Sequence, residues 1–455
     1  MQRRIFGIET EYGITCAGEG GTPPPLNAEE AARELFNPLL QTARSTNVFL
    51  PNGGRLYLDV GAHPEYATAE CDTVWDLLAQ VRAGASILST LATTANQNLS
   101  EQDTPGTIHL FGNNQDSQGS SYGCHENYLL RRRRDFREVA DALVAFFVTR
   151  QIISGAGDIR IAEDGRGHFV ISSRADQMHE ALSAATTQSR PIINTRDEPL
   201  ADSGAYRRLH VIVGDSNMAE PTTALKVATA DMVLAAVENG ARLDDLALAD
   251  PMKAIREVSA DLSGQVKIEL ADGRRWTAAQ IQTEIKNRTL AAIDQENLPD
   301  LYKYLIGLWE RAIDAVASGD WSEIDKEIDF AIKHKLLLAY RDRSGAEWAD
   351  PRVQRLALSY HDITAAGLLP KLEQAGVVVR LTNPEQVAAA EALPPQTTRA
   401  KLRGETIAAA NLARRDLGVD WVNLRLDVEG IAIALQDPFA TADPRIDSLV
   451  DLLHK

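Results

Sequence analysis

The order of elements along the chain predicts an α+β fold rather than a doubly wound parallel sheet. Strand-like segments come first, long helical patterns follow, and a small mixed segment closes the chain. Runs of strands followed by runs of helices are typical of α+β proteins. A change in composition comes at "EALPPQTTRAK", where two prolines interrupt the chain. We therefore predict a large domain over residues 1–390 and a small α/β domain over residues 391–455.

The composition is that of an ordinary folded protein, with 455 residues of which 44% are hydrophobic. A net charge of −17 argues against a general nucleic-acid binder, because affinity for phosphate comes from lysine and arginine. No run approaches the ~20 apolar residues of a membrane span, and the N-terminus lacks the pattern of a signal peptide. Three cysteines are too few for a disulfide framework or a zinc cluster. We expect a cytoplasmic protein without nucleic-acid or membrane partners, whose metal, if any, is held by oxygen ligands.

The first part of the chain alternates strands with helices. A helix is expected over 27–44, with Asn27 as its N-cap and Glu30 three positions later. A second helix is expected from Thr73 to about residue 99, and a buried helix over 136–154. Strands are predicted at residues 3–15, 55–60, about 65–70, 107–114 and 127–132.

The remaining elements are mostly helical. Strands are expected at 167–174 and 207–216, a helix over 222–238, and a mainly helical stretch over 276–343. After the prolines come a helix over 398–415 and a hairpin over 420–435 that turns near Glu429–Gly430. The alternation of the hairpin predicts that Val422, Leu424, Leu426 and Val428 face inward and leave Trp421 outside the apolar stripe.

The motif "GIETEYG" places two glutamates, Glu9 and Glu11, on the same face of a strand. Carboxylates this close repel each other, and a hard divalent cation such as Mg²⁺ removes that penalty. The alternative is a polar strand face near a sheet edge.

The stretch "RLYLDVGAHPEYAT" puts Arg55, Tyr57 and Asp59 on one face of a strand. An arginine can clamp a phosphate, and a carboxylate can act as a general base or as a metal ligand. Glu65 lies just after the turn that follows this strand, and it becomes a metal ligand only if that turn folds back. In a regular strand Glu65 and Thr68 face opposite ways, so a bulge or an early strand start is needed to bring both to one site. The alternative is a solvated strand face.

Two further stretches carry candidate residues. In "SSYGCHENY", His125 and Asn127 share a strand face, and the neighbouring cysteine is expected to be structural. In residues 190–225, Arg208 and His210 share a face among several arginines, which suits phosphoryl transfer because charge builds on the moving phosphate oxygens. Surface ion pairs beside a turn are the alternative reading of that second stretch.

Taken together, these stretches resemble the Pup–protein ligases, a family also called proteasome accessory factor A. The resemblance rests on "RRIFGIETEYG", "NVFLPNGGRLYLDVGAHPEYATAECD", "SSYGCHENY", "RPIINTRDEP", "RRLHVIVGDSNM" and "DWVNL", and it covers almost the whole chain. The broader relatives are the carboxylate–amine ligases of the glutamine synthetase and glutamate–cysteine ligase superfamily. The resemblance implies a curved antiparallel sheet, packed with helices, that forms a cradle for ATP and Mg²⁺.

The resemblance also implies an activity and a set of site residues. Such a ligase uses ATP to phosphorylate the C-terminal glutamate of Pup, a small disordered modifier protein. A lysine of a target protein then attacks, and the resulting isopeptide bond marks the target for the proteasome. By matching motif, Asp59 is the expected catalytic proton acceptor. The expected Mg²⁺ ligands are Glu9, Tyr57 and Glu65, and the expected ATP contacts are Arg55, Thr68 and Trp421. Position alone adds Glu11 and His210 to the metal site and Arg208 to the ATP site. It also places Asn127 beside these two sites.

Three alternatives remain open. The paralogous Pup deamidase or depupylase shares the fold but hydrolyses, and its family typically carries a longer insertion after the first strand. Here only residues 16–26 separate that strand from the first helix, which favours the ligase. A small-molecule glutamate–amine ligase is the second alternative, and a Pup receptor without enzymatic activity is the third.

Overall fold

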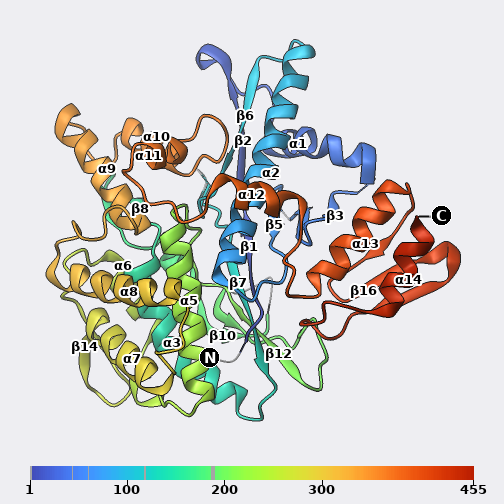
Figure 1. The fold of residues 1–455 in the computed structure, drawn as a ribbon. Coiled ribbons are helices and arrows are strands. Elements are labelled where there is room, and N and C mark those ends of the chain that lie inside the picture. Colours follow the sequence, from blue (N-terminus) through green and yellow to red (C-terminus); the bar gives the residue numbers. More distant parts are fainter. Residues whose placement is uncertain (1–2, 44, 60, 117–118, 186–189, 455) are drawn as a thin grey trace.

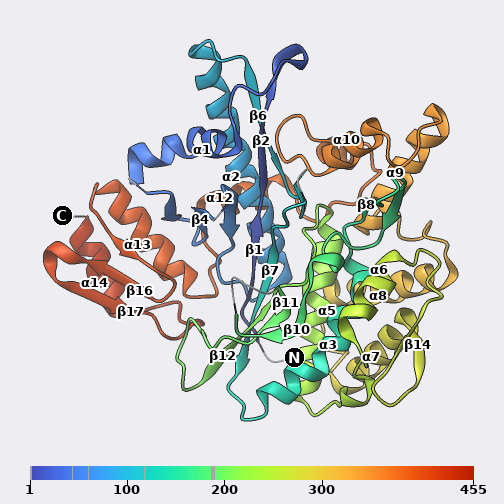
Figure 2. The same cartoon turned by 180° about the vertical axis from the view of Figure 1, so that it is seen from behind.

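The fold is built on an eight-stranded sheet, seen in the centre of the computed structural model in Figures 1 and 2. The structure describes residues 3–43, 45–59, 61–116, 119–185 and 190–454. The strand order is β10-β11-β12-β7-β1-β5-β4-β3, and every neighbouring pair is antiparallel except β10 with β11. The predicted α+β class is therefore confirmed. The strands are β1 (Phe6–Glu11), β3 (Asn47–Phe49), β4 (Arg55–Leu58), β5 (Pro64–Ala67), β7 (Cys124–Arg131), β10 (Glu180–Ser183), β11 (Pro191–Asn194) and β12 (Tyr206–Val211).

The predicted first strand is in fact two strands with different partners. β1 pairs with β5 and β7 inside the sheet, whereas β2 (Gly13–Gly18) pairs only with β6 (Gly106–Phe111). The change comes at the buried Tyr12, whose backbone N–H donates to the carbonyl of Pro64 at 2.8 Å. The β2–β6 pair consequently projects away from the rest of the sheet (Figure 1).

The first two helices begin where the sequence predicts. Asn27 and Glu30 cap α1 (Ala28–Ala43) reciprocally, because each side chain accepts the other's backbone N–H at 2.9 Å. Thr73 caps α2 (Val74–Glu101) by accepting the N–H of Asp76 at 3.0 Å. The predicted N-cap at Asn27 and the predicted helix start at Thr73 are both confirmed.

Helices cover one face of the sheet, which we call the back face. α3 (Phe136–Thr149) and α5 (Glu220–Glu238) pack there together with α2, and α5 is buried all round from Glu220 to Val237. Ile8, Tyr128 and Leu209 of the sheet join the resulting hydrophobic core. The opposite, front face is left to the polar side chains described below.

The remaining helices and strands lie outside these layers. α7 (Ala278–Ala292) and α8 (Asp300–Ser318) pack on the outer side of α5. α12 (Pro384–Ala392) packs on α2. The others are α4 (Gln151–Ser154), α6 (Pro251–Ala260), α9 (Asp329–Ser344), α10 (Pro351–Tyr360) and α11 (Leu369–Gln374), with the hairpins β8 (Asp158–Ile161)–β9 (Gly167–Val170) and β13 (Lys267–Glu269)–β14 (Arg275–Thr277).

The C-terminal segment has a hydrophobic cluster of its own, which includes Leu402, Leu424 and Leu449. The cluster supports the predicted small domain, whose boundary near residue 390 stays a prediction. The hairpin turns at Gly430 as expected. The inward orientation predicted for Val428 is wrong: it lies in a 3₁₀ turn and is 89% exposed. The elements are α13 (Ala400–Leu412), β15 (Gly418–Val419), β16 (Asn423–Leu426), β17 (Ile431–Ala434) and α14 (Pro444–Leu453).

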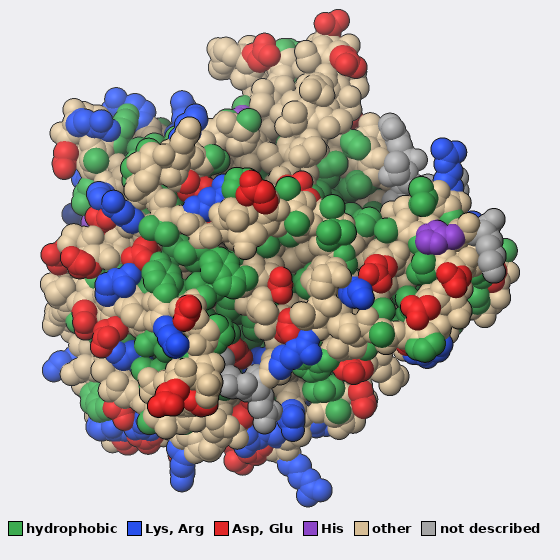
Figure 3. All heavy atoms as spheres, in the orientation of Figure 1, with side chains coloured by type: hydrophobic (Ala, Val, Ile, Leu, Met, Phe, Trp, Pro, Cys, Tyr) green, Lys and Arg blue, Asp and Glu red, His purple; other side chains and the backbone are tan. Residues whose placement is uncertain are grey.

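The surface carries acidic and basic side chains interspersed over the face drawn in Figure 3, with a hydrophobic area near its middle. The net charge of −17 is therefore not gathered into a single acidic surface on this face. Within the described part of the chain, no helix combines the length and the apolar character that crossing a membrane requires.

Candidate active site

The front face of the sheet collects the polar side chains that the sequence singled out. Strand alternation and register explain this, because residues paired across neighbouring strands point to the same face. Glu9 lies opposite His125 on one side and Ala67 on the other, and Ala67 lies opposite Arg55. The same face carries Glu11, Tyr57, Glu65, Asn127, Arg208 and His210.

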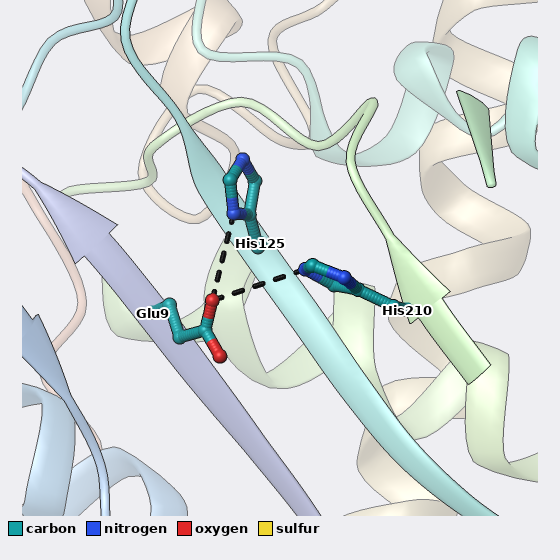
Figure 4. A group of neighbouring side chains, drawn as sticks. All are labelled: Glu9, His125 and His210. Carbon is teal, nitrogen blue, oxygen red and sulfur yellow. Dashed lines mark ion pairs between the residues drawn. The ribbon is translucent and has the colours of Figure 1, made fainter. Parts of the chain in front are cut away.

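A first group of possible metal donors consists of Glu9, His125 and His210, from β1, β7 and β12 (Figure 4). Both imidazole rings turn toward one carboxylate oxygen, Glu9 Oε2. That oxygen lies 3.5 Å from His125 Nδ1 and 3.8 Å from His210 Nε2. Among the described residues, His210 Nε2 is buried without a hydrogen-bond partner. This group therefore presents a carboxylate and two ring nitrogens around a common point.

The protonation states of this group suit cation binding. Burial lowers the pKa of His210 to about 3, so its ring is neutral at pH 7 and offers a lone pair. Burial raises the pKa of Glu9, but the neighbouring His125, His210 and Arg208 side chains outweigh that effect and lower it well below the usual range. Among these neighbours Arg208 carries a permanent positive charge. Glu9 is consequently an anion.

A second donor group consists of Glu11, Asp59 and Glu65, whose carboxylates offer oxygens within 4.8 Å of one another. Glu65 lies opposite Glu11 across β5 and β1, and opposite Tyr57 across β5 and β4. The Tyr57 hydroxyl donates a hydrogen bond to the Glu65 carboxylate. Asp59 follows directly after β4 and reaches the same group.

The electrostatics of the second group fit a divalent cation. Burial, followed by the negative charges of Glu9, Glu11 and Asp59, raises the pKa of Glu65 to about 9. Without a cation the cluster therefore holds a proton that a carboxylate in water would release. A hard cation such as Mg²⁺ prefers oxygen ligands and would replace this proton in offsetting the negative charge of the carboxylates. The donor set present here fits such an ion.

Arg208 and Asn127 link the first donor group to a neighbouring pocket. Asn127 Nδ2 donates to Glu9 Oε1 at 3.1 Å, and Arg208 Nη1 donates to Asn127 Oδ1 at 3.1 Å. Arg208 Nη2 reaches Glu198 Oε2 at 3.2 Å, and its buried Nε has no partner among the described residues. The guanidinium is therefore held in place with one donor still free.

The pocket lies between the front face and the C-terminal segment. It has a volume of about 80 Å³ and is lined by Glu9, Thr68, Asn127, Arg208 and Trp421, among others. It brings together three of the four predicted ATP contacts. The fourth, Arg55, is not among its lining residues and lies on the same face with its guanidinium 4.2 Å from the centre of the Tyr57 ring.

Trp421 is held at the pocket by contacts from both parts of the chain. Its ring lies edge-on to Phe49 of β3, with the ring centres 4.9 Å apart. The guanidinium of Arg403 lies 5.0 Å from the centre of the indole. Arg403 and Arg399 both bind the buried carboxylate of Glu70, which lies shortly after the end of β5 at Ala67. This buried cluster fixes the C-terminal segment against the sheet.

Glu65 and Thr68 reach the site without a bulge. β5 begins at Pro64 and ends at Ala67, so Glu65 keeps the front-face orientation of a regular strand. Thr68 follows the strand and turns toward Gly7, and its Oγ1 accepts the N–H of Ile8 at 3.1 Å. A β-carbon at Gly7 would lie 3.0 Å from Thr68 Oγ1, so this position favours glycine. We expected either a bulge or an early strand start; instead the strand ends at Ala67, so Thr68 no longer follows the strand alternation.

The polar side chains of residues 190–225 do not gather on one face of the sheet. Arg208 and His210 reach the front face, but Asp215 lies buried and accepts hydrogen bonds from three backbone N–H groups and the Ser172 hydroxyl. Arg207 packs on the ring of Phe136, 3.7 Å from its centre. The prediction that this stretch forms one arginine-rich constellation is therefore only partly right.

His125 is the residue that sequence reasoning placed on the correct face without assigning it a role. The alternation in "CHENY" indicated this face, because it places His125 and Asn127 on the same side of one strand. The partner ring, His210, is 85 positions away in the printed sequence, and only the β7–β12 pairing brings both to Glu9. Local spacing carries no information about that pairing.

Carboxylate clusters beside an arginine and a pocket are typical of enzymes that transfer phosphoryl groups. The comparisons agree with that class. A family model described as "Pup-ligase protein" matches residues 4–425. The Pup–protein ligase of Sanguibacter keddieii is 51% identical over 99% of both chains, and that of Mycolicibacterium smegmatis is 49% identical over 99% of both.

Solved structures give the same answer. The ligase PafA in its complex with the prokaryotic ubiquitin-like protein Pup superimposes with a TM-score of 0.93 at 40% identity, covering 99% of this chain and 91% of the other. PafA in complex with ADP superimposes with a TM-score of 0.84 at 40% identity, covering 96% and 95%. This chain belongs to the Pup-ligase family.

Proposed function

We propose that this protein is an ATP-dependent ligase that joins Pup to lysine side chains of target proteins. The observation that carries the proposal is the 51% identity over 99% of the chain to a protein named Pup–protein ligase. The front face adds chemical support, because its carboxylates, arginine and pocket meet at one place.

The reaction needs two steps. ATP first transfers its terminal phosphoryl group to the side-chain carboxylate of the C-terminal glutamate of Pup, which gives an acyl phosphate and ADP. The lysine amine then attacks the acyl carbon, the bond to the phosphate oxygen breaks, and inorganic phosphate leaves. A free carboxylate is a poor electrophile, so the first step makes the second possible.

We assign the nucleotide to the front face, with one part of it in the small pocket beside the C-terminal segment. Trp421 offers a ring face for adenine, and Thr68 offers a hydroxyl. Arg208, with its unpartnered Nε, would hold phosphate oxygens. Arg55, on the same face of the sheet, would be a second contact to the phosphates.

We assign Mg²⁺ to the two donor groups, with Asp59 kept apart as the proton acceptor. The raised pKa of Glu65, at about 9, supports a cation beside these carboxylates. When bound, the ion would offset the negative charge of the phosphates during transfer. The residues that would hold it are Glu9, His210, Glu11, Tyr57 and Glu65, with His125 as an addition from the first donor group.

We assign proton acceptance to Asp59. A lysine has an ordinary pKa of ~10.4 and is protonated at neutral pH, so a base must take a proton before its nitrogen can attack. Asp59 is half-buried at the end of β4, beside the second donor group, where an incoming amine would meet a carboxylate.

A single conjugation assay tests the proposal. The protein is incubated with Mg·ATP, Pup ending in glutamate and a lysine-bearing target, and the products are analysed by intact-mass spectrometry. We expect the target mass to increase by that of Pup less one water, together with ADP release. Ammonia release from a Pup that ends in glutamine, without conjugate, would instead assign the protein as a deamidase.

A further inference from the structure

A cavity of about 340 Å³ lies behind the sheet, on the opposite side from the donor groups. Ile8, Thr10 and Cys124 form part of its wall, and they alternate along β1 and β7 with the front-face residues Glu9 and His125. α2 and the start of α5 form other parts of the wall. The volume falls in the ~300–1,000 Å³ range of sites for small molecules.

A buried lysine lines this cavity. Lys226 of α5 is 1% exposed, and its Nζ donates to the carbonyl of Asp215 at 2.8 Å and lies 3.5 Å from Cys124 Sγ. No carboxylate of the described residues forms an ion pair with it. The negative charge of Glu126, on the same strand as Cys124, acts on Lys226, but both Glu126 oxygens are already held by N–H groups of Arg150 at 2.8 and 2.6 Å. A buried charge without a counterion is unfavourable, so the ammonium favours an anion in the cavity.

The other charged groups along the cavity already have partners. Arg82 binds the carboxylates of Glu220 and Glu373, and Arg380 lies 3.9 Å and 4.0 Å from the same two. Asp362 Oδ2 lies 3.0 Å from His109 Nδ1. Lys226 is therefore the charge that a ligand would neutralise.

The remaining wall offers hydrogen-bonding groups. Asn217 lines the cavity, and its buried Oδ1 has no hydrogen-bond partner among the described residues. An unsatisfied buried acceptor is unfavourable, so a donor on the ligand would be stabilised there. Ser86 and Thr90 of α2 add hydroxyl groups on the opposite wall.

We propose that this cavity is a second binding site, which takes a small carboxylate that also carries a hydroxyl group. The carboxylate faces the Lys226 ammonium, and the hydroxyl donates to Asn217 Oδ1. The site is separate from the proposed ATP pocket, since the two lie on opposite faces of β1.

Cys124 provides a direct test, because its thiol lies 3.5 Å from the ammonium. Iodoacetate carries a carboxylate, and iodoacetamide is its uncharged counterpart. With either reagent the cysteine sulfur bonds to the CH₂ carbon while iodide and a proton leave. In the folded full-length protein, site-resolved mass spectrometry gives the iodoacetate-to-iodoacetamide rate ratio at each cysteine. We expect this ratio to be at least tenfold higher at Cys124 than at Cys71 or Cys16, which are buried away from the cavity.

Two controls make the result specific. Glycerate, a small hydroxylated carboxylate, should slow alkylation of Cys124 saturably and leave Cys71 unchanged. Lys226→Gln should bring the ratio at Cys124 down to that at Cys71, whereas Lys253→Gln, at an exposed lysine, should have no effect.

The proposal is overturned if Cys124 is not alkylated in the folded protein, if the ratio equals that at Cys71, or if glycerate gives no protection. The glycerate experiment uses the unmodified chain, so it decides the question even if Lys226→Gln fails to fold. Conjugation activity is not needed for any of these readouts, so failure here is distinguishable from failure of the proposed ligase function.

Discussion

Glu11 and Glu65 face each other directly across β1 and β5, and both carboxylates join the same donor group with Asp59. Like charges opposite each other in a sheet are destabilising, and no described lysine or arginine forms an ion pair with either of these two glutamates. Burial and the neighbouring carboxylates raise the pKa of Glu65 to about 9, so a proton offsets this repulsion when no cation is bound. A cation would replace that proton, and its binding can be measured.

Mg²⁺ should stabilise the protein against unfolding. At 100 times its dissociation constant, a ligand of the folded state adds about 2.7 kcal/mol to the free energy of unfolding. We expect thermal unfolding in 10 mM Mg²⁺ to occur several degrees higher than in EDTA. Glu65→Gln should remove most of the increase, whereas Glu163→Gln, at an exposed glutamate, should keep it. An equal shift in all three proteins would argue against the assigned ligands.

Asp59→Asn should separate nucleotide binding from conjugation. The amide keeps the shape of the side chain but cannot accept a proton from lysine, so conjugate formation should fall by about 10²–10⁴-fold. The dissociation constant of Mg·ATP, measured by calorimetry, should change by less than about threefold because Asp59 does not line the pocket. Asp314→Asn, at an exposed aspartate, is the matched control. Near-normal conjugation by Asp59→Asn would remove this residue from the mechanism.

Trp421→Ala should weaken nucleotide binding. Stacking of a base on an aromatic ring contributes about 1–3 kcal/mol, which corresponds to roughly a 5- to 150-fold rise in the dissociation constant of Mg·ATP. Trp421→Phe should recover part of the loss. Trp75→Ala removes a tryptophan that is 41% exposed and lies outside the pocket, and it should leave ATP affinity unchanged. An unaltered affinity in Trp421→Ala would show that adenine binds elsewhere.

Glu70→Gln should loosen the C-terminal segment. Breaking a buried ion pair by removing one partner costs about 3–5 kcal/mol, and here Arg399 and Arg403 would both lose their carboxylate. We expect the variant to unfold at markedly lower urea concentration and to expose the 393–420 region to proteolysis first. Glu391→Gln, at an exposed position on α12, is the control. Cleavage at other sites first would argue against this role.

The same cluster predicts a dependence on pH. Burial raises the pKa of Glu70, but the two arginines outweigh it and lower that pKa to about 2, against an ordinary value of 4.5. The folded state therefore binds fewer protons than the unfolded state in this range, so the stabilisation is complete above about pH 4.5 and is lost as the pH falls toward 2. The difference in urea midpoint between wild type and Glu70→Gln should shrink over that interval. A constant difference from pH 7 to pH 2.5 would contradict the assignment.

Strand alternation predicted which side chains share one face of the sheet better than it predicted where the strands begin and end. Alternation within "RLYLDV" and "GIETEYG" suffices to place Arg55, Tyr57, Glu9 and Glu11 on one face, because side-chain direction is a local property. The break at Tyr12 was missed, since it depends on a hydrogen bond to Pro64, more than fifty residues away.

The longer-range parts of the site were beyond local reasoning. His125 meets His210 only through strand pairing, and Asp215 is drawn to the back face by hydrogen bonds from the segment 156–174. Val428 continues the apolar alternation of its hairpin, yet the 3₁₀ turn ends the strand before it. In each case a distant partner or a local change of backbone overrode the pattern.

Glu9 and Glu11 stand two residues apart on the same short strand, and each belongs to a different donor group. The separation of the two groups is therefore set by the repeat of an extended backbone, about 3.3 Å per residue. A slip of β1 by one position against its neighbours would turn both glutamates to the back face together, into the hydrophobic core. Insertion or deletion of a single residue in β1 ahead of Glu9 should for this reason displace both groups together, whereas one at Thr10 should displace only one of them.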